Sequence, residues 1–139
     1  MKQMIKEKIV LDSFALLSFL KGEAESEKVV GKINLAYSKT CHLAMSSLNL
    51  GEVFYIMCRE KSEEFAIRQE AEIFRLPIEF VETDWELIRD AAMIKAQYPM
   101  AFADCFAAAL AFRMDAFLMT GDPEFRQIEK KLNILWLQK

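Results

Sequence analysis

The sequence predicts an α/β fold in which helices cover both faces of a central parallel sheet. Short apolar runs, each long enough for one buried strand, alternate along the chain with longer helical segments, and this alternation is typical of β-α-β units. The chain has 139 residues, of which 53% are hydrophobic and 28% are charged, as expected for one well-packed core. We therefore expect a single domain over residues 1–139.

The first half of the chain predicts two strands and four helices. The apolar run Ile-Val-Leu at residues 9–11 favours a buried strand that ends at Asp12. The helix that follows stops near Gly22, and the next one places its apolar residues on one face. In order, we expect a strand at 9–11, helices at 14–20 and 23–37, a strand at 40–45, and a helical hairpin at 49–59 and 62–74.

The second half predicts three further strands with helices between them. Thr83 and Glu86 have the spacing of a capping box, in which the first residue caps a helix and the second bonds back to it. Pro99 is expected to start the next helix, which runs to Met114, and Pro123 to start a short one. The strands are expected at 78–81, 116–119 and 134–136.

Four acidic residues lie where these elements begin or end. Asp12 directly follows the first strand, and Asp122 follows the strand at 116–119 after Thr120 and Gly121. Glu52 and Asp104 lie in the first turns of their helices. Because ligands bind beyond the carboxyl ends of parallel strands, we expect the four carboxylates to converge on one edge of the sheet.

Each acid also has a purely structural interpretation. Asp12 and Asp122 could simply cap the helices that follow them, and Glu52 could be the capping-box partner of Asn49. Asp104 fits such an interpretation least, because twelve of the thirteen residues from 100 to 112 are apolar. An acid in so buried a helix is unfavourable unless it is paired, hydrogen-bonded or bound to metal.

Clustered carboxylates require positive charge, and hard oxygen ligands on rigid elements suit Mg²⁺ or Mn²⁺. Such a metal can generate hydroxide from bound water and stabilise an in-line displacement at phosphorus. A Ser-His-Asp site is excluded as an alternative, because His42 is the only histidine and is expected to be structural. The acids therefore predict metal-dependent phosphodiester chemistry.

The net charge, the cysteines and the apolar stretches limit the binding partners and the cellular compartment that can be expected. A net charge of −3 has the wrong sign for a general nucleic-acid coat, and no basic residue can be assigned to RNA from sequence. Three cysteines without metal-ligand spacing indicate reduced, packed thiols. The longest apolar stretch, residues 100–119, is interrupted by charges, so we expect a soluble, cytoplasmic protein without a membrane span. The scattered basic candidates are Arg59, Lys61, Arg68, Arg89, Lys95 and Arg113.

Four sequence blocks resemble the motifs of the PIN-domain family, and within it the single-domain VapC toxins of toxin–antitoxin pairs. The blocks are VLDSFALLSFL, SSLNLGEV, FADCFAAALA and LMTGDPEF, in this order, and the resemblance extends from about Lys8 to Trp136. FADCFAAALA and TGDPEF are the most specific. The resemblance implies an α/β/α sandwich with a parallel sheet, in agreement with the reading from the residues.

The resemblance also implies a site and an activity. Its acidic site would fall on Asp12, Glu52, Asp104 and Asp122, with Ser13 and Thr120 as supporting residues. It implies an endoribonuclease dependent on Mg²⁺ or Mn²⁺ that leaves 5′-phosphate and 3′-hydroxyl ends, a homodimer, and inhibition by a cognate antitoxin. We expect a basic side chain from that antitoxin to enter the carboxylate cluster.

Other functions fit less well. A phospho-receiver domain needs paired acids after its first strand, where Ser13 and Phe14 stand, and a haloacid-dehalogenase-type enzyme needs an Asp at position 14. A non-catalytic binding module would have no reason to keep buried Asp104. Cleavage of DNA, or RNA processing outside a toxin–antitoxin pair, stays open as an alternative.

Overall fold

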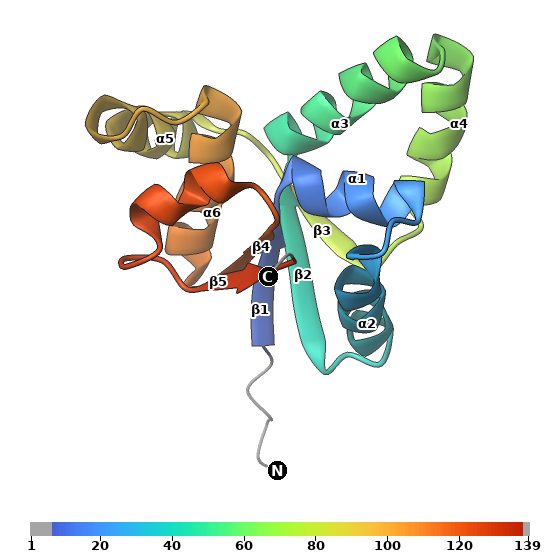
Figure 1. Ribbon diagram of the computed structural model, residues 1–139, viewed down its shortest axis with the longest axis horizontal. Helices are drawn as coiled ribbons and strands as arrows, with labels where there is room; N and C mark the ends of the chain where they lie inside the picture. Colours follow the sequence, from blue (N-terminus) through green and yellow to red (C-terminus); the bar gives the residue numbers. More distant parts are fainter. Residues whose placement is uncertain (1–6, 138–139) are drawn as a thin grey trace.

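The computed structural model describes residues 7–137, which form five parallel strands with helices on both sides of the sheet (Figure 1). The strands are β1 (Glu7–Leu11), β2 (Cys41–Ser46), β3 (Ile78–Val81), β4 (Phe117–Thr120) and β5 (Ile134–Trp136). Their order is β3-β2-β1-β4-β5, so the chain moves outward from β1 in one direction and then returns to continue on its other side. The strand order therefore reverses between β1 and β4, where the functional crevice of such sheets lies.

The helices form two layers, each packed on one face of the sheet. The elements are α1 (Ser13–Lys21), α2 (Ser26–Tyr37), α3 (Ser47–Glu60), α4 (Glu63–Ile73), α5 (Trp85–Gln97), α6 (Phe102–Met114) and the 3₁₀ helix η1 (Pro123–Ile128). Ile9 and Leu11 of β1 pack with residues of the first four helices, whereas Val10 packs with α5, α6 and η1. Side chains alternate across a strand, so β1 contributes to both cores. The predicted α/β/α sandwich is confirmed.

The α3–α4 hairpin and the α5–α6 layer diverge above the carboxyl ends of the strands (Figure 1). Asn49 fixes α3 to α6, because its side-chain Nδ2 donates a hydrogen bond to the Ala103 carbonyl oxygen at 2.9 Å. The same Asn49 accepts a hydrogen bond from the Ser46 hydroxyl at 2.6 Å. None of the helices within residues 7–137 combines the length and the apolar character needed to cross a membrane.

Three predicted helix starts are wrong. Helix α2 begins at Ser26 rather than at Glu23. Asp84, not Thr83, caps α5, because its carboxylate accepts a hydrogen bond from the Leu87 backbone N–H at 2.8 Å. The next helix begins at Phe102 rather than at Pro99. The residue before a proline is disfavoured in helical conformation, and Met100 is drawn into the core as part of an extended segment.

Candidate functional site

Asp12 is a buried acid at the junction of β1 and α1. It caps α1 as the structural interpretation suggested, since its Oδ1 accepts a hydrogen bond from the Ala15 N–H at 2.8 Å. Its Oδ2 accepts a hydrogen bond from the Thr120 hydroxyl. Burial is the main cause that raises the pKa of Asp12 to about 7; the two hydrogen bonds act against it, and the charges of Asp122 and Glu52 act with it. The cap is thus also an acid with two acidic neighbours.

Thr120, at the end of β4, connects Asp12 to Asp122. The hydroxyl that donates to Asp12 accepts a hydrogen bond from the Asp122 backbone N–H at 3.0 Å, and Thr120 is fully buried. Between them, Gly121 lies so close to Phe14 that any added Cβ would overlap the phenyl ring. The T-G-D order of the sequence therefore follows from packing against α1 as well as from the position of the acid.

Asp122 caps η1 and faces the other acids. Its Oδ1 accepts a hydrogen bond from the Glu124 N–H at 2.9 Å, with Pro123 in the first position of the helix. Its charge also raises the pKa of both Asp12 and Asp104. Capping and a place in the acidic cluster are therefore compatible.

Glu52 is held by Ser13 and does not serve as a capping-box partner. The Ser13 hydroxyl donates a hydrogen bond to Glu52 Oε1 at 2.6 Å, which joins the start of α1 to α3. Helix α3 begins at Ser47 and is capped by Ser46, so the alternative interpretation, in which Glu52 is the capping-box partner of Asn49, is wrong. The carboxylate is left facing the start of α1.

Asp104 lies in the first turn of α6, and its side chain is almost completely buried. Burial, the hydrogen bond to Glu124 and the charges of Asp122, Asp12 and Glu124 together raise the pKa of Asp104 to about 8. Without a cation, Asp104 therefore keeps a proton near neutral pH and shares it with Glu124. This is the strongest sign of a specialised environment in the protein.

Glu124 is a fifth carboxylate that sequence reasoning did not single out. Its Oε1 accepts a hydrogen bond from the Ala101 N–H at 2.8 Å, just before α6 begins. That hydrogen bond lowers the pKa of Glu124, and the hydrogen bond from Asp104 and the charge of Lys95 lower it further. The sequence feature that could have identified Glu124 is its position two residues after Asp122, in the first turn of a helix that starts with proline.

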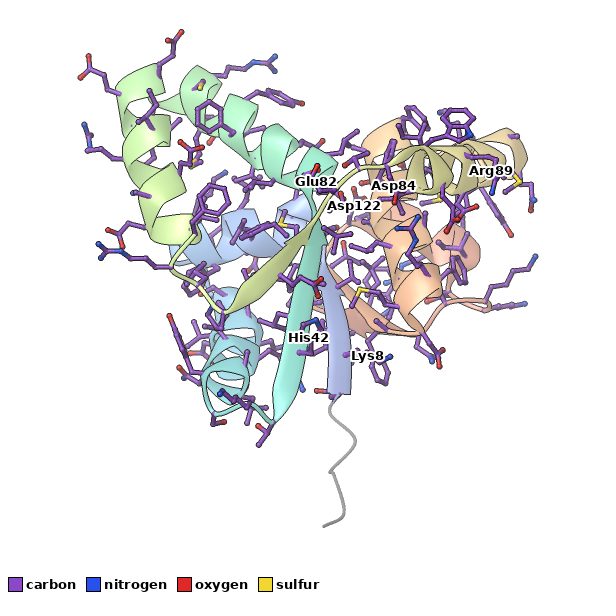
Figure 2. All side chains as sticks on the ribbon, turned by 180° about the vertical axis from the view of Figure 1, so that it is seen from behind. Lys8, His42, Glu82, Asp84, Arg89 and Asp122 are labelled. Carbon is purple, nitrogen blue, oxygen red and sulfur yellow. The ribbon has the colours of Figure 1, made fainter. Side chains whose placement is uncertain are left out.

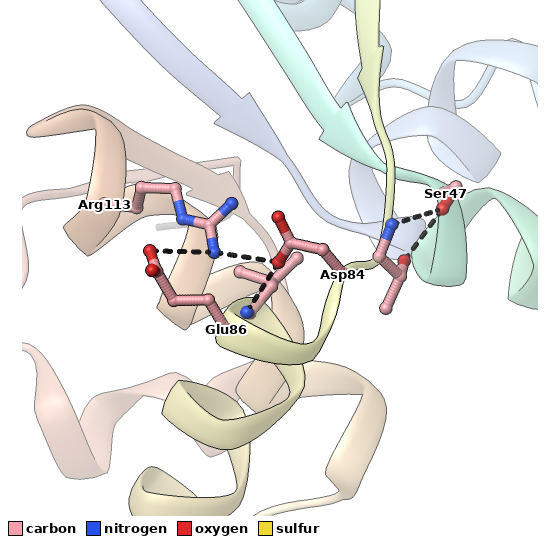
Figure 3. A network of polar contacts seen from close by, with 6 residues as sticks. Ser47, Asp84, Glu86 and Arg113 are labelled. Atoms are coloured by element: carbon pink, nitrogen blue, oxygen red, sulfur yellow. Dashed lines mark hydrogen bonds and ion pairs between the residues drawn. The ribbon is translucent and has the colours of Figure 1, made fainter.

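A polar network beside the acids was also missed. Thr83, the residue expected to cap α5, instead exchanges hydrogen bonds with Ser47 at the start of α3: the two hydroxyls lie 2.8 Å apart, and the Thr83 N–H donates to the Ser47 hydroxyl at 3.2 Å (Figure 3). Arg113 lies between Asp84 and Glu86 on the other side of the same loop. These contacts fix α3 and α5 relative to the carboxyl edge.

The only histidine lies elsewhere on the sheet. Figure 2 shows His42 and Lys8 on the lower part of the sheet and Asp122 at its carboxyl edge. His42 Nε2 lies 2.8 Å from Glu79 Oε1 in an exposed pair. This arrangement agrees with a structural role for His42.

The donor set fits a hard divalent cation that keeps part of its water. All the candidate ligands are carboxylates: Asp12, Glu52, Asp104 and Asp122. Among residues 7–137, no three His, Cys, Asp or Glu side chains stand close enough together to enclose an ion by themselves. Mg²⁺ is usually bound by few carboxylates with water completing its shell, so the spacing is compatible with it. Burial, and after it the charges of the neighbouring acids, raise the pKa values of Asp12 and Asp104, and a bound cation would offset both effects.

Several solved structures of similar fold come from toxin–antitoxin systems. A chain of the DNA-bound VapBC structure from Salmonella typhimurium is 20% identical, with a TM-score of 0.72 over 94% of this chain and 98% of that one. A chain of VapBC2 from Rickettsia felis, bound to a DNA fragment from the promoter, is 19% identical, with a TM-score of 0.70 over 92% and 97%. Mycobacterium tuberculosis VapC20, a toxin that cleaves the sarcin-ricin loop, is 18% identical, with a TM-score of 0.67 over 86% and 93%.

At these identities the likeness shows a shared fold. No curated protein matches the chain in sequence. The family comparison is more direct, because the PIN domain model matches residues 9–131. That match spans most of the sequence and includes all four acids that the sheet brings to its carboxyl edge, and the chain belongs to the PIN domain family.

Proposed function

We propose that this protein is an endoribonuclease dependent on Mg²⁺ or Mn²⁺, and the toxin of a VapBC-like toxin–antitoxin pair. The observation that carries the proposal is the environment of Asp104: an acid buried in an apolar helix, facing other acids, with its pKa raised to about 8. The toxin–antitoxin structures of the same fold support the biological setting. The use of strands from residue 7 to residue 136 in one sheet supports treating residues 1–139 as one nuclease domain.

The proposed site assigns a task to each side chain. Asp12, Glu52, Asp104 and Asp122 would hold the metal directly or through water, and the metal, when bound, would supply hydroxide and positive charge for the displacement at phosphorus. The Ala15 N–H and the Thr120 hydroxyl fix the two oxygens of Asp12, and the Ser13 hydroxyl fixes one oxygen of Glu52. Each carboxylate oxygen has a second lone pair, so both acids can still bind a ligand. These two hydroxyls are positioning groups of the kind that tune metal sites.

The test is cleavage of a single-stranded RNA by the purified protein, with DNA of the same sequence as the competing substrate. We expect cutting of RNA in Mg²⁺ or Mn²⁺, products with 5′-phosphate ends, and no cutting in excess EDTA. Cleavage that persists undiminished in EDTA contradicts the metal mechanism. Preferential cutting of DNA supports the alternative assignment.

The antitoxin partner is part of the proposal. Two apolar clefts lie next to each other on the first helical layer, one of about 270 Å³ between α3 and α4, and one of about 470 Å³ bounded by α1, α3 and α4. Met57 lines both. In this proposal, an apolar antitoxin segment occupies them while its basic side chain reaches the carboxylates. Full inhibition by an antitoxin whose C-terminal Arg is changed to Ala would place the inhibitory contact elsewhere.

As part of the proposed toxin function, we also propose that the protein is a homodimer and lies in the cytoplasm. Exposed apolar side chains gather on α5 and α6, where Trp85, Met93 and Phe112 are each more than 40% exposed. Such surfaces often mark protein interfaces. Light scattering of the purified protein tests the dimer, and a monomer at micromolar concentration contradicts it.

A further inference from the structure

Tyr55 and Arg59 form an exposed aromatic–cation pair on α3. The Tyr55 side chain is 47% exposed, and the Arg59 guanidinium carbon lies 5.2 Å from the centre of its ring. That distance is within the range of a cation–π interaction, which holds the two side chains in a fixed relative position. The pair is therefore pre-ordered without being buried.

The pair lies on the same face of α3 as Glu52. Residues separated by three and seven positions lie above one another on a helix, which places Tyr55 about 4.5 Å and Arg59 about 10.5 Å along the axis from Glu52. Helix α3 starts at the carboxyl end of β2 and runs outward from the sheet (Figure 1). The pair therefore continues outward from the acidic site as a surface that a bound strand can follow.

Folding does not account for the exposed ring. Two other aromatic residues form cation–π pairs, Trp136 with Arg126 and Tyr98 with Lys131. Both rings pack against the hydrophobic core that α5, α6 and η1 form on the sheet. Tyr55 belongs to neither core cluster. Its ring is thus the one of these three that a ligand can reach without unpacking the interior.

In the described part of the chain, Arg59 differs from Arg113 and Lys21 in having no carboxylate partner. Arg113 is neutralised by Asp84 and Glu86, and Lys21 by Glu60. Within residues 7–137, no carboxylate forms an ion pair with Arg59, whose guanidinium lies over a ring instead. The positive charge is therefore available for an anion, on a protein whose net charge of −3 otherwise repels RNA.

We propose that Tyr55 and Arg59 bind the nucleotide next to the cleaved phosphodiester, the ring stacking on an unpaired base and the guanidinium binding the adjoining phosphate. This inference rests on the proposed ribonuclease function. Stacking on aromatic side chains together with backbone contacts from Arg is how proteins hold single-stranded RNA. The pair contributes to binding of the substrate, and the carboxylates perform the chemistry.

The test measures kcat and KM on a single-stranded RNA in Mg²⁺. Loss of one stacked base typically weakens binding by about tenfold, so Y55A should raise KM by about that factor with kcat within about twofold of wild type. Y55F keeps the ring and should behave as wild type. R59A should raise KM and flatten the slope of log(kcat/KM) against log[salt] by about 0.7, the value for one phosphate contact on a single strand, whereas R59K keeps the slope.

Tyr37 and Arg75 provide a matched control pair. Tyr37 is 58% exposed and its hydroxyl donates to the Arg75 carbonyl oxygen at 3.5 Å, but both residues lie where the strands β2 and β3 begin. Y37A and R75A should leave KM and the salt slope unchanged. An unchanged KM in Y55A, or equal effects of Y55A and Y37A, overturns the inference while leaving the ribonuclease proposal intact.

A binding series separates this inference from the proposed function. The same variants are titrated with a fluorescent RNA oligonucleotide in Ca²⁺, where anisotropy reports binding. If wild-type protein binds RNA in Ca²⁺ but cuts none in Mg²⁺, the ribonuclease proposal fails. A weaker affinity of Y55A would still support the pair as an RNA-binding surface. If wild-type protein neither binds nor cuts RNA, both are wrong.

Discussion

Helices α5 and α6 each have an aspartate at their start, but the two aspartates differ in burial, in hydrogen-bond partner and in the direction of their pKa shift. Asp84, at the start of α5, is exposed, accepts a hydrogen bond from the Leu87 N–H and pairs with Arg113 at 3.1 Å. The Leu87 N–H and then Arg113 hold the pKa of Asp84 below its usual range. Asp104, at the start of α6, is buried, and its partner is another acid, Glu124. The pKa of Asp104 is raised to about 8.

This difference shows that an acid near a helix start acquires a special role through burial and through the sign of its neighbours. The α5 acid stabilises the fold in its charged form. The charged form of the α6 acid is unfavourable in the folded protein until a cation compensates it. The two positions therefore make a matched pair for mutagenesis.

The largest difference between the two helix starts is expected in activity. D104N removes a proposed metal ligand and should lower RNA cleavage by at least a hundredfold, because even the residues that support metal ligands contribute about 10–100-fold. D84N makes the same chemical change outside the carboxylate cluster and should keep most of the activity. Initial cleavage rates in Mg²⁺ measure both, and equal losses would remove the distinction between the two acids.

A change at Thr120 should have the next largest effect. T120V deletes the hydroxyl that donates to Asp12 and accepts from the Asp122 N–H, and should lower cleavage by about 10–100-fold. Leaving buried polar groups without partners should also lower the free energy of unfolding by about 1–3 kcal/mol. T120S retains the hydroxyl and is the control. A T120V enzyme with full activity would show that Asp12 needs no such positioning.

The two acids should impose opposite pH dependences on stability in EDTA. The pKa of Asp104 is about 8 in the folded protein against an ordinary value of 3.8, so the folded state binds its proton more tightly. The stabilisation from that proton is complete below pH 3.8 and is lost as the pH rises to 8.

D104N mimics the protonated acid, and at pH 8 it should be more stable than wild type by at least about 1 kcal/mol, the equivalent of one pKa unit. The advantage should vanish toward pH 4. Because the folded pKa of Asp84 is lowered, its contribution is present above the ordinary pKa and lost as the pH falls below it, so D84N should be less stable than wild type at pH 7. Urea unfolding at several pH values measures both slopes, and parallel profiles would contradict the comparison.

The fold could be predicted from sequence because its signals are local. Continuous apolar runs such as residues 9–11 are typical of strands buried on both sides, and the positions of all five strands were predicted to within one or two residues. The predictions of helix starts were less accurate where contacts between residues distant in sequence compete with local capping hydrogen bonds. Thr83 has good capping chemistry, but its hydroxyl bonds to Ser47, which is distant in sequence, and Asp84 caps the helix instead.

The candidate site was predictable where burial itself is visible in the sequence. Asp104 stands out because it interrupts an apolar helix, and the four acids lie at element ends that a parallel sheet brings together. Glu124 was missed because nothing local separates it from a surface glutamate in a first turn. Its hydrogen bonds to Ala101 and Asp104 exist only once η1 packs beside α6. The role of Glu52 likewise depends on Ser13, 39 positions away.

The central claim is that the acids form one cation site, and thermal melts of wild type and D104N, each in EDTA and in Mg²⁺, test it most directly. At about ten times its dissociation constant, Mg²⁺ should stabilise wild type by about 1.4 kcal/mol, or about 3 °C in Tm. Near pH 8, D104N should melt above wild type in EDTA and gain little from Mg²⁺. If D104N melts below wild type in EDTA and both proteins gain equally from Mg²⁺, the acids are unrelated helix caps and the shared site is wrong.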